Sequence, residues 1–121
     1  MYVIDLPLLA PSTNTYYRRS GHHIHISNKG KEFKRAAQEI ILEKFPEQSP
    51  LKCNIELNLE LHFKHKRARD IDNYNKALLD SMTGIIYEDD SQITSMKIRK
   101  FIGSDSDKIL IKISEDNYIN K

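Results

Sequence analysis

The sequence predicts an α+β fold: a small single domain, residues 1–121, in which a mixed β-sheet has two helices packed against it. Three observations lead to this prediction. Residues 51–63 alternate between apolar and polar side chains without a break, which indicates a strand with one buried face. Residues 28–45 and 72–83 have apolar side chains at helical spacing. Further strand-like segments lie toward both ends of the chain, at residues 2–6, 91–102 and 109–113.

The first third of the chain is predicted to contain a short strand, a turn and a long helix. Pro7 ends the strand at residues 2–6, and residues 11–14 have the composition of a turn. Residues 16–26 are strand-like or looped. Ser27 is a suitable N-cap for a helix of about sixteen residues, whose apolar stripe comprises Phe33, Ala36, Ala37, Ile40, Ile41 and Phe45.

The remainder alternates strand, helix and strand. The long strand leads directly into a charged segment, so a rigid sheet element delivers Asp70 to its place. Gly84 is the expected stop of the helix at residues 72–83. After the strand at residues 91–102, residues 103–107 are predicted to form a hairpin turn into the closing strand.

Composition is that of a soluble globular chain, with 39% hydrophobic residues, 30% charged residues and a formal net charge of +2. No apolar run approaches the roughly 20 residues that span a bilayer, and the N-terminus lacks a signal-peptide pattern. Cys53 is the single cysteine, so it cannot form an intrachain disulfide or a cysteine-based zinc site. We therefore expect a cytoplasmic protein with no membrane segment.

The segment at residues 67–76, Arg-Ala-Arg-Asp-Ile-Asp-Asn-Tyr-Asn-Lys, places two carboxylates two residues apart. In an extended chain Asp70 and Asp72 point the same way, so their oxygens can converge on one hard cation. A calcium EF-hand is excluded, because Asn75 and Ser81 occupy its glycine and glutamate positions. The simpler alternative is a helix N-cap followed by a solvated turn.

Two further charged features follow on the same side of the sequence. Lys76 and Asp80 lie on one helix face with Asp72, where they could form only a weak surface salt bridge. A second acidic cluster, Tyr87-Glu88-Asp89-Asp90, could fold back onto the first.

Three groups of residues are similar to the motifs of one known family. The core is Arg67-x-Arg69-Asp70-x-Asp72-Asn73-x-x-Lys76, followed by Asp80 and Glu88-Asp89-Asp90-x-x-Ile93. The N-terminal groups are Pro11-Ser12-x-Asn14-x-Tyr16-Tyr17-Arg18 and Ser27-x-x-Gly30-x-x-Phe33-Lys34-Arg35. Over nearly its whole length the chain thus resembles the RusA family of Holliday junction resolvases, and we expect one RusA-like endonuclease domain.

The resemblance implies a Mg²⁺-dependent endodeoxyribonuclease, with Mn²⁺ as an alternative ion and no small-molecule cofactor. Asp70 and Asp72 would supply two metal ligands, and Asp90 the third, with Asp89 as its close competitor. Lys76 would stabilise charge on the phosphate or orient the attacking water. Supporting roles around the site are expected for Asp80, Asn73 and Asp89.

Basic and polar residues outside the acidic motif are expected to contact DNA. The candidates are Arg67, Arg69, Lys76, Arg18, Arg19 and Asn14. His22, His23 and His25 could bind a metal, but no acidic residue lies between Asp5 and Glu32, which disfavours a zinc site. A polar hairpin that contacts DNA is the preferred interpretation of this segment.

The resemblance also implies a homodimer that acts on a four-way junction or other branched DNA, since two symmetric nicks require two symmetric active sites. The expected role is resolution of Holliday junctions in DNA recombination and repair, in a phage or prophage setting. Two alternatives stay open: a phage nuclease for flaps or forks, and a non-enzymatic junction-binding module with structural carboxylates.

Overall fold

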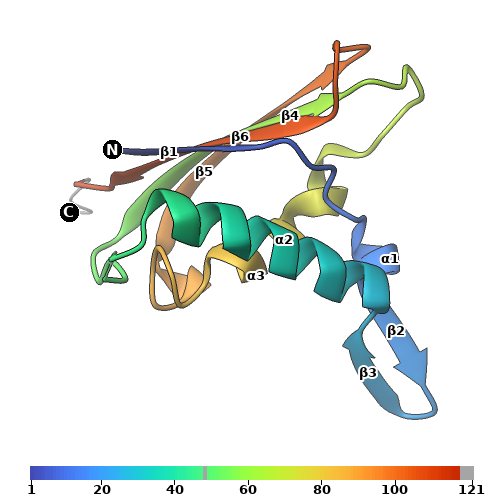
Figure 1. Ribbon diagram of the computed structural model, residues 1–121, viewed down its shortest axis with the longest axis horizontal. Coiled ribbons are helices and arrows are strands. Elements are labelled where there is room, and N and C mark those ends of the chain that lie inside the picture. The colour runs from blue at the N-terminus through green and yellow to red at the C-terminus, as the bar shows by residue number, and fades with distance from the viewer. Residues whose placement is uncertain (48, 118–121) are drawn as a thin grey trace.

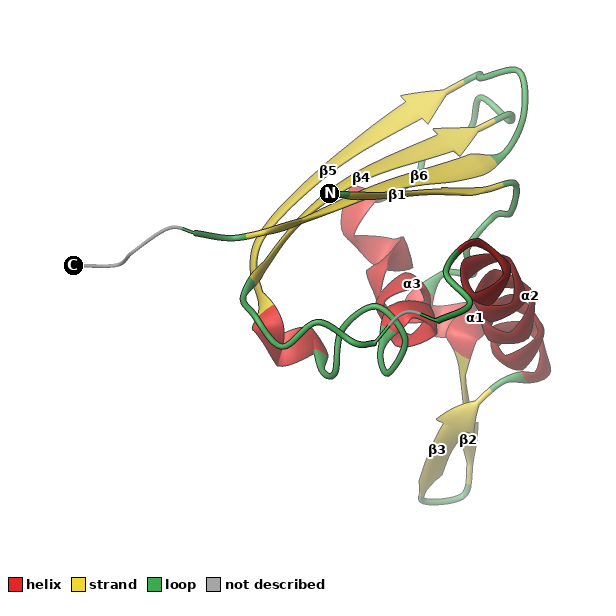
Figure 2. Cartoon of the chain, turned by 60° about the vertical axis from the view of Figure 1, so that its left-hand side comes forward, coloured by secondary structure: helices red, strands yellow, loops and turns green. Residues whose placement is uncertain are grey.

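A computed structural model describes residues 1–47 and 49–117. Four strands form a mixed sheet in the order β1-β6-β4-β5, where β1 is Tyr2–Leu6, β4 Ile55–Phe63, β5 Ile93–Ile102 and β6 Lys108–Glu115 (Figure 1). Helices α2 (Asn28–Lys44) and α3 (Asn75–Met82) lie on one side of this sheet (Figure 2). The predicted α+β class with a mixed sheet is therefore confirmed. No helix in the described part of the chain is long and apolar enough to cross a membrane.

Strand β4 is the centre of the sheet, as its alternation predicts. Every second side chain from Ile55 to Phe63 is buried against the helices. The predicted start at Leu51 is four residues too early. Leu51 instead forms an isolated bridge with Tyr87, and the carbonyl of Cys53 accepts a hydrogen bond from the Gln92 side chain at 2.9 Å. These contacts attach the segment before β4 to the second acidic cluster.

The predicted hairpin between the last two strands is wrong. β5 pairs parallel with β4, whereas β6 pairs antiparallel with the opposite edge of β4. Residues 103–107 therefore cross the end of β4, where Ser104 N donates to Phe63 O at 3.0 Å and Lys64 N donates to the Asp107 carboxylate at 2.8 Å. The crossing segment thereby fixes the direction in which the chain leaves β4.

Helix α2 begins and ends close to the predicted residues. Ser27 is its N-cap, and its hydroxyl accepts a hydrogen bond from Gly30 N at 3.1 Å. The helix buries Phe33, Ala37 and Ile41 against the core. This agreement reflects two local signals, a strong cap and a periodic apolar stripe.

A third helix was not expected. Residues predicted as a turn form the short helix α1 (Thr13–Tyr16), because the Ser12 side chain accepts a hydrogen bond from Thr15 N. The chain then continues into a two-stranded hairpin, β2 (Tyr17–Ser20) and β3 (His23–Ile26), which stands away from the rest of the molecule in both ribbon views (Figures 1 and 2).

The helix predicted at residues 72–83 has two parts. It begins with a 3-10 turn, η1 (Ile71–Tyr74), and continues as α3. Gly84 follows with a φ of 84°, a left-handed conformation that favours glycine, and its N–H donates to Tyr87 O at 2.7 Å. This sharp turn directs the chain back toward Asp90, the first residue of the 3-10 turn η2 (Asp90–Gln92).

Candidate active site

Asp70 and Asp72 lie just beyond β4, at the start of η1, and both are exposed. Asp70 occupies the N-cap position of η1, but its side chain makes no capping hydrogen bond. Among the described residues, no side chain or backbone group forms a hydrogen bond or ion pair with either carboxylate. Helix capping is therefore not the function of these carboxylates, and both are available to a cation from outside the chain.

The loop that holds Asp70 is fastened through Arg69. Only 7% of Arg69 is exposed, and its guanidinium carbon lies 4.4 Å from the centroid of the Phe63 ring. One guanidinium nitrogen donates to Tyr74 Oη at 3.4 Å, while Lys100 Nζ donates to the Arg69 carbonyl. The contacts of Arg69 are thus internal, and its predicted contact with DNA stays a prediction.

Lys76 projects from the first turn of α3 and is paired with Asp80. Lys76 Nζ lies 3.0 Å from Asp80 Oδ1, and Tyr16 Oη donates to the other carboxylate oxygen at 2.8 Å. Asp80 is mostly buried, with 20% of its side chain exposed, whereas Lys76 is 43% exposed. The carboxylate therefore holds the ammonium from the protein side and leaves its outer surface open.

The pKa values of these groups reflect the same arrangement. The hydrogen bond to Asp80 raises the pKa of Lys76, and the charge of Asp90 adds to the increase. Burial raises the pKa of Tyr16 far above its usual range, with a further contribution from its hydrogen bond to Asp80. At neutral pH Lys76 is thus a cation and Tyr16 a neutral donor.

The two candidates for a third ligand, Asp89 and Asp90, differ in their contacts. Asp89 is the N-cap of η2, where its carboxylate accepts from Ser91 N at 3.0 Å, and the Gln92 side chain completes a capping box. The hydrogen bond from Ser91 lowers the pKa of Asp89. Asp90 makes no such capping contact and acts electrostatically on Lys76. Asp89 already has a structural partner, so Asp90 is the better candidate for a ligand.

Within residues 1–47 and 49–117, no group of three or more His, Cys, Asp or Glu side chains is close enough to hold a metal ion. The hairpin histidines therefore do not form a metal site as placed. The acidic residues fit a hard divalent cation by chemistry, because exposed carboxylates without protein partners are the ligands that Mg²⁺ prefers. The three-aspartate ligand set remains a prediction.

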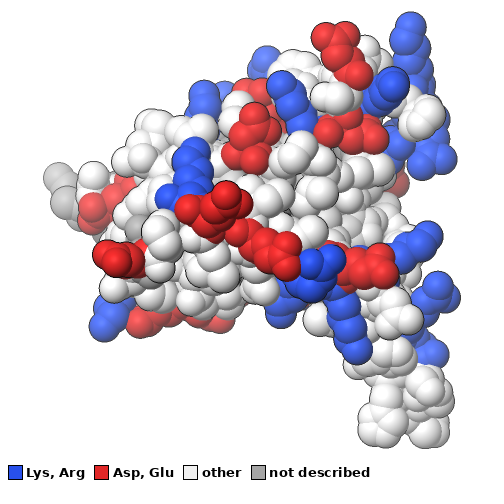
Figure 3. Space-filling model, in the orientation of Figure 1, with Lys and Arg blue, Asp and Glu red and all other residues white. Residues whose placement is uncertain are grey.

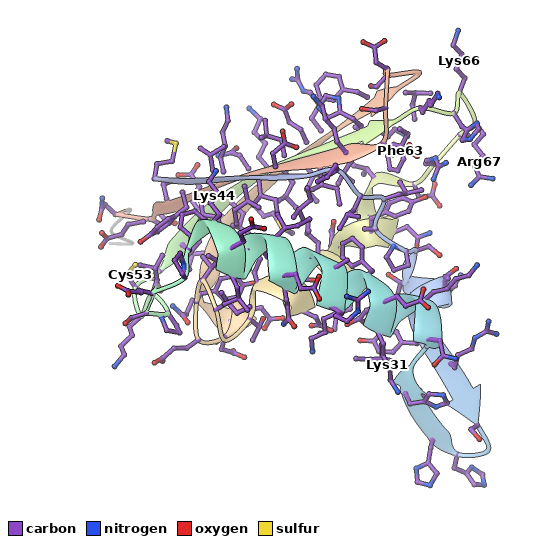
Figure 4. All side chains as sticks on the ribbon, in the orientation of Figure 1. Lys31, Lys44, Cys53, Phe63, Lys66 and Arg67 are labelled. Carbon is purple, nitrogen blue, oxygen red and sulfur yellow. The ribbon has the colours of Figure 1, made fainter. Side chains whose placement is uncertain are left out.

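Basic side chains lie on the loop that precedes Asp70 and along the first half of α2. Arg67 is exposed, and with Lys66 it points outward from the loop after Phe63 (Figure 4). A groove of about 740 Å³ lies between this loop and the first half of α2, with Arg67, Arg69, Lys29 and Arg35 among its lining residues. Several Lys and Arg side chains also gather at the end of the molecule from which the hairpin projects (Figure 3).

The remaining predicted DNA contacts lie near the hairpin. Asn14 is exposed on α1, and Arg18 and Arg19 are exposed on β2. Asn73 contacts α1 from the segment that contains Asp70 and Asp72: its carbonyl accepts a hydrogen bond from Thr13 Oγ1 at 3.2 Å. Helix α1 thus joins the hairpin to the acidic loop.

Comparison with known proteins assigns the family. A family model described as endodeoxyribonuclease RusA matches residues 8–114. This chain belongs to the RusA family. Its relatives include the crossover junction endodeoxyribonuclease RusA of Enterobacteria phage HK97, 34% identical over 94% of this chain and 92% of the relative. The proteins of the same name from phage 82 and Escherichia coli K12 are 30% and 29% identical, each over 94% of both chains.

Tyr16 has no role that the sequence alone predicts. The tyrosine is fully buried and lies 64 positions before its partner Asp80. A signal was available in the N-terminal motif, which contains Tyr16 without explaining it. Lys76 and Asp80 form the ion pair that their i, i+4 spacing predicts, whereas the supporting role of Asp80 in the site stays a prediction.

Proposed function

We propose that this chain is a metal-dependent endodeoxyribonuclease that resolves Holliday junctions, in DNA recombination and repair. The observation that carries the proposal is the RusA family match over residues 8–114, together with two exposed, unpartnered carboxylates at Asp70 and Asp72. A structural role for these carboxylates would require partners, and none is present among the described residues. A non-enzymatic binding module is therefore the weaker interpretation.

We assign the metal ligands to Asp70, Asp72 and Asp90. Bound there, Mg²⁺ or Mn²⁺ would supply an activated water and stabilise negative charge on the phosphodiester. The chain itself keeps the first two carboxylates exposed and fixes their loop through the buried guanidinium of Arg69. Asp89, engaged as the cap of η2, holds the backbone that presents Asp90.

Lys76 is proposed to contact the scissile phosphate. Its ammonium is held on one side by Asp80 and is partly exposed on the other, which orients a positive charge toward an approaching phosphate. Preorganised charge of this kind stabilises negative charge that develops in a transition state. Arg67, Arg18 and Arg19 would bind the flanking backbone, which positions the substrate without reading its sequence.

A homodimer is part of the proposal, because a junction has two-fold symmetry and one chain carries only one proposed set of metal ligands. Strand β5 is at an edge of the sheet, and two of its apolar side chains, Met96 and Ile102, are 41% and 40% exposed. Such an edge is suited to contact with another chain. Sedimentation equilibrium at micromolar concentration should therefore show a dimer, and a 14 kDa species throughout would contradict it.

The test compares Asp70→Asn and Asp72→Asn with the wild-type chain. Both variants should lose cleavage of a four-way junction in the presence of Mg²⁺ while they still shift the junction in a gel. Asp105→Asn is the matched control, because Asp105 is also an exposed aspartate of an Asp-x-Asp pair but lies in the crossing segment. Omission of Mg²⁺ should abolish cleavage by the wild-type chain.

Two results would change the conclusion. If both variants cleaved the junction at the wild-type rate, the carboxylates of Asp70 and Asp72 would have no role in the cleavage reaction. Efficient cleavage of flaps or forks, with little cleavage of four-way junctions, would instead support the branched-DNA nuclease. A linear duplex of the same sequence serves as the non-branched reference.

A further inference from the structure

The β2–β3 hairpin projects from the molecule, and one exposed apolar side chain, Ile24, lies in the second residue pair from its Gly21–His22 turn. Ile24 is 62% exposed, which among the described residues makes it the most exposed large hydrophobic side chain after the N-terminal Met1. Ile24 pairs with Arg19 across the hairpin, on the same face as the Tyr17–Ile26 pair. That face therefore continues from the half-buried Tyr17–Ile26 pair at the base of the hairpin to Ile24 in solvent.

The charge of the hairpin is of one sign. Between Asp5 and Glu32 the sequence contains no acidic residue, whereas the hairpin carries Arg18 and Arg19 in addition to its histidines. Arg18 pairs with His25 on one face and Arg19 with Ile24 on the other. Each face thus carries one arginine and no carboxylate, a composition suited to contact with a polyanion such as DNA. Lys31 at the start of α2 lies beside the base of the hairpin (Figure 4).

The base of the hairpin is firmly attached. Ser27 N donates to Tyr16 O at 2.8 Å, and the Ser27 hydroxyl donates to Thr15 O at 2.5 Å. Gly30 allows this close packing, because a Cβ at that position would lie only 2.7 Å from Ile26 and 2.8 Å from Tyr16. The turn is equally defined, since Gly21 has a φ of 62° in the two-residue connection.

The same base is connected to Lys76. Tyr16 directly precedes β2, and its hydroxyl donates to Asp80, the ion-pair partner of Lys76. Two contacts, Tyr16 with Asp80 and Asp80 with Lys76, therefore fix the position of the hairpin relative to Lys76, because Tyr16 is covalently joined to the first residue of β2. A projecting element with this attachment is suited to bind the same DNA as the active site.

We propose that the β2–β3 hairpin enters the branch point of a DNA junction and inserts Ile24 between base pairs. Arg18 and Arg19 would bind the phosphates on either side. Apolar wedges flanked by cations unstack DNA in this way, and unstacking costs least where the stack is already interrupted, as it is at a branch point. The proposal rests on the proposed function, since it assumes that the chain binds branched DNA. A contact between two copies of the chain fits less well, because it would bring like charges together.

The experiment uses a four-way junction and a linear duplex, each with 2-aminopurine at the same position, which in the junction is the branch point. Fluorescence is measured without divalent metal, so that no strand is cut. The wild-type chain should raise the fluorescence of the junction and leave the duplex nearly unchanged. Ile24→Ser should lose most of the rise at saturating protein and bind the junction about tenfold more weakly, whereas Ile24→Leu should keep both.

Leu42→Ser is the matched control, because Leu42 is also an exposed aliphatic side chain, 47% exposed, but lies on α2. This variant should raise the fluorescence as the wild-type chain does. An undiminished rise with Ile24→Ser would overturn the wedge, as would a loss of dimer by Ile24→Ser in sedimentation. Junction binding by the wild-type chain with no rise would overturn the wedge alone. Absence of junction binding would overturn the proposed function as well.

Discussion

Replacement of Tyr16 by phenylalanine tests whether the buried tyrosine positions Lys76. The change removes one hydroxyl, which donates to Asp80 at 2.8 Å, and leaves the fully buried ring in place. Asp80 would keep its ion pair with Lys76, but its second oxygen would lose a fixed partner. We expect the carboxylate, and with it the ammonium, to sample more orientations.

The size of the effect follows from the bond that is lost. A hydrogen bond to a charged group contributes about 1.5–3 kcal/mol, and the partial exposure of Asp80 reduces the expected contribution of this one to about 1–2 kcal/mol. For a domain of this size that corresponds to a decrease in Tm of about 4–8 °C. If the same free energy is lost from the transition state, the single-turnover cleavage rate falls about five- to thirtyfold.

The assay is single-turnover cleavage of a four-way junction at saturating enzyme, which removes binding from the comparison. The raised pKa of Lys76 means that the ion pair is fully present at neutral pH and is lost only as the pH rises above the usual lysine range. Rates measured from pH 7 to 9 should therefore fall by the same factor in Tyr16→Phe, with an unchanged pH profile.

Tyr87→Phe is the matched control. Tyr87 is also fully buried, and its hydroxyl donates to the neutral Leu79 O at 2.9 Å, so the variant loses a buried tyrosine hydrogen bond, about 1 kcal/mol, that does not involve Asp80. It should lose stability but retain the cleavage rate. Equal slowing in both variants would mean that general loosening, rather than Tyr16, is responsible. A wild-type rate for Tyr16→Phe would refute the positioning role.

Three further outcomes are expected. The variant Lys76→Arg should not support cleavage, because a planar guanidinium places its donors elsewhere than an ammonium does. A cleavage rate within a few-fold of wild type would show that Lys76 has only a structural role. Asp90→Asn should abolish nicking, whereas Asp89→Asn should retain it, since asparagine caps as well as aspartate; the reverse would exchange their roles. Gly30→Ala should lower stability in thermal melts by about 1–3 kcal/mol, because its Cβ would lie 2.9 Å from Tyr16 O; an unchanged Tm would show that the hairpin base yields.

The elements that the sequence predicts well are those with a local cause. The buried face of β4 and the start of α2 both follow from signals within a few residues, an alternating pattern and a serine cap. The prediction of a β5–β6 hairpin is wrong because a turn motif shows only that the chain reverses direction, not which strands pair. Which strand lies between the two depends on the parallel pairing of β4 with β5, a contact between residues far apart in sequence.

The same distinction applies to the site. Asp70, Asp72 and Lys76 could be selected as candidate site residues because one short segment contains all three. The Tyr16–Asp80 contact could not be predicted, because its two residues lie 64 positions apart. The choice between the adjacent aspartates was available locally. Asp89 is followed three residues later by Gln92, the spacing of a capping box, and the structure forms that box.

The acidic loop combines exposed carboxylates with a fixed backbone. Among the described residues, neither Asp70 nor Asp72 has an ion-pair partner, so the loop gains no charge pairing within the chain. Yet the loop is tied at several points: Lys100 donates to the Arg69 carbonyl, Arg69 packs on Phe63, and Thr13 donates to the Asn73 carbonyl at 3.2 Å. A hydrogen bond of this kind contributes about 1 kcal/mol, so together these contacts hold the backbone of the loop in one conformation. A turn that only had to be solvated would need none of them. Ties that hold unpaired carboxylates in place are expected where a divalent cation, bound from outside the chain, supplies the missing charge.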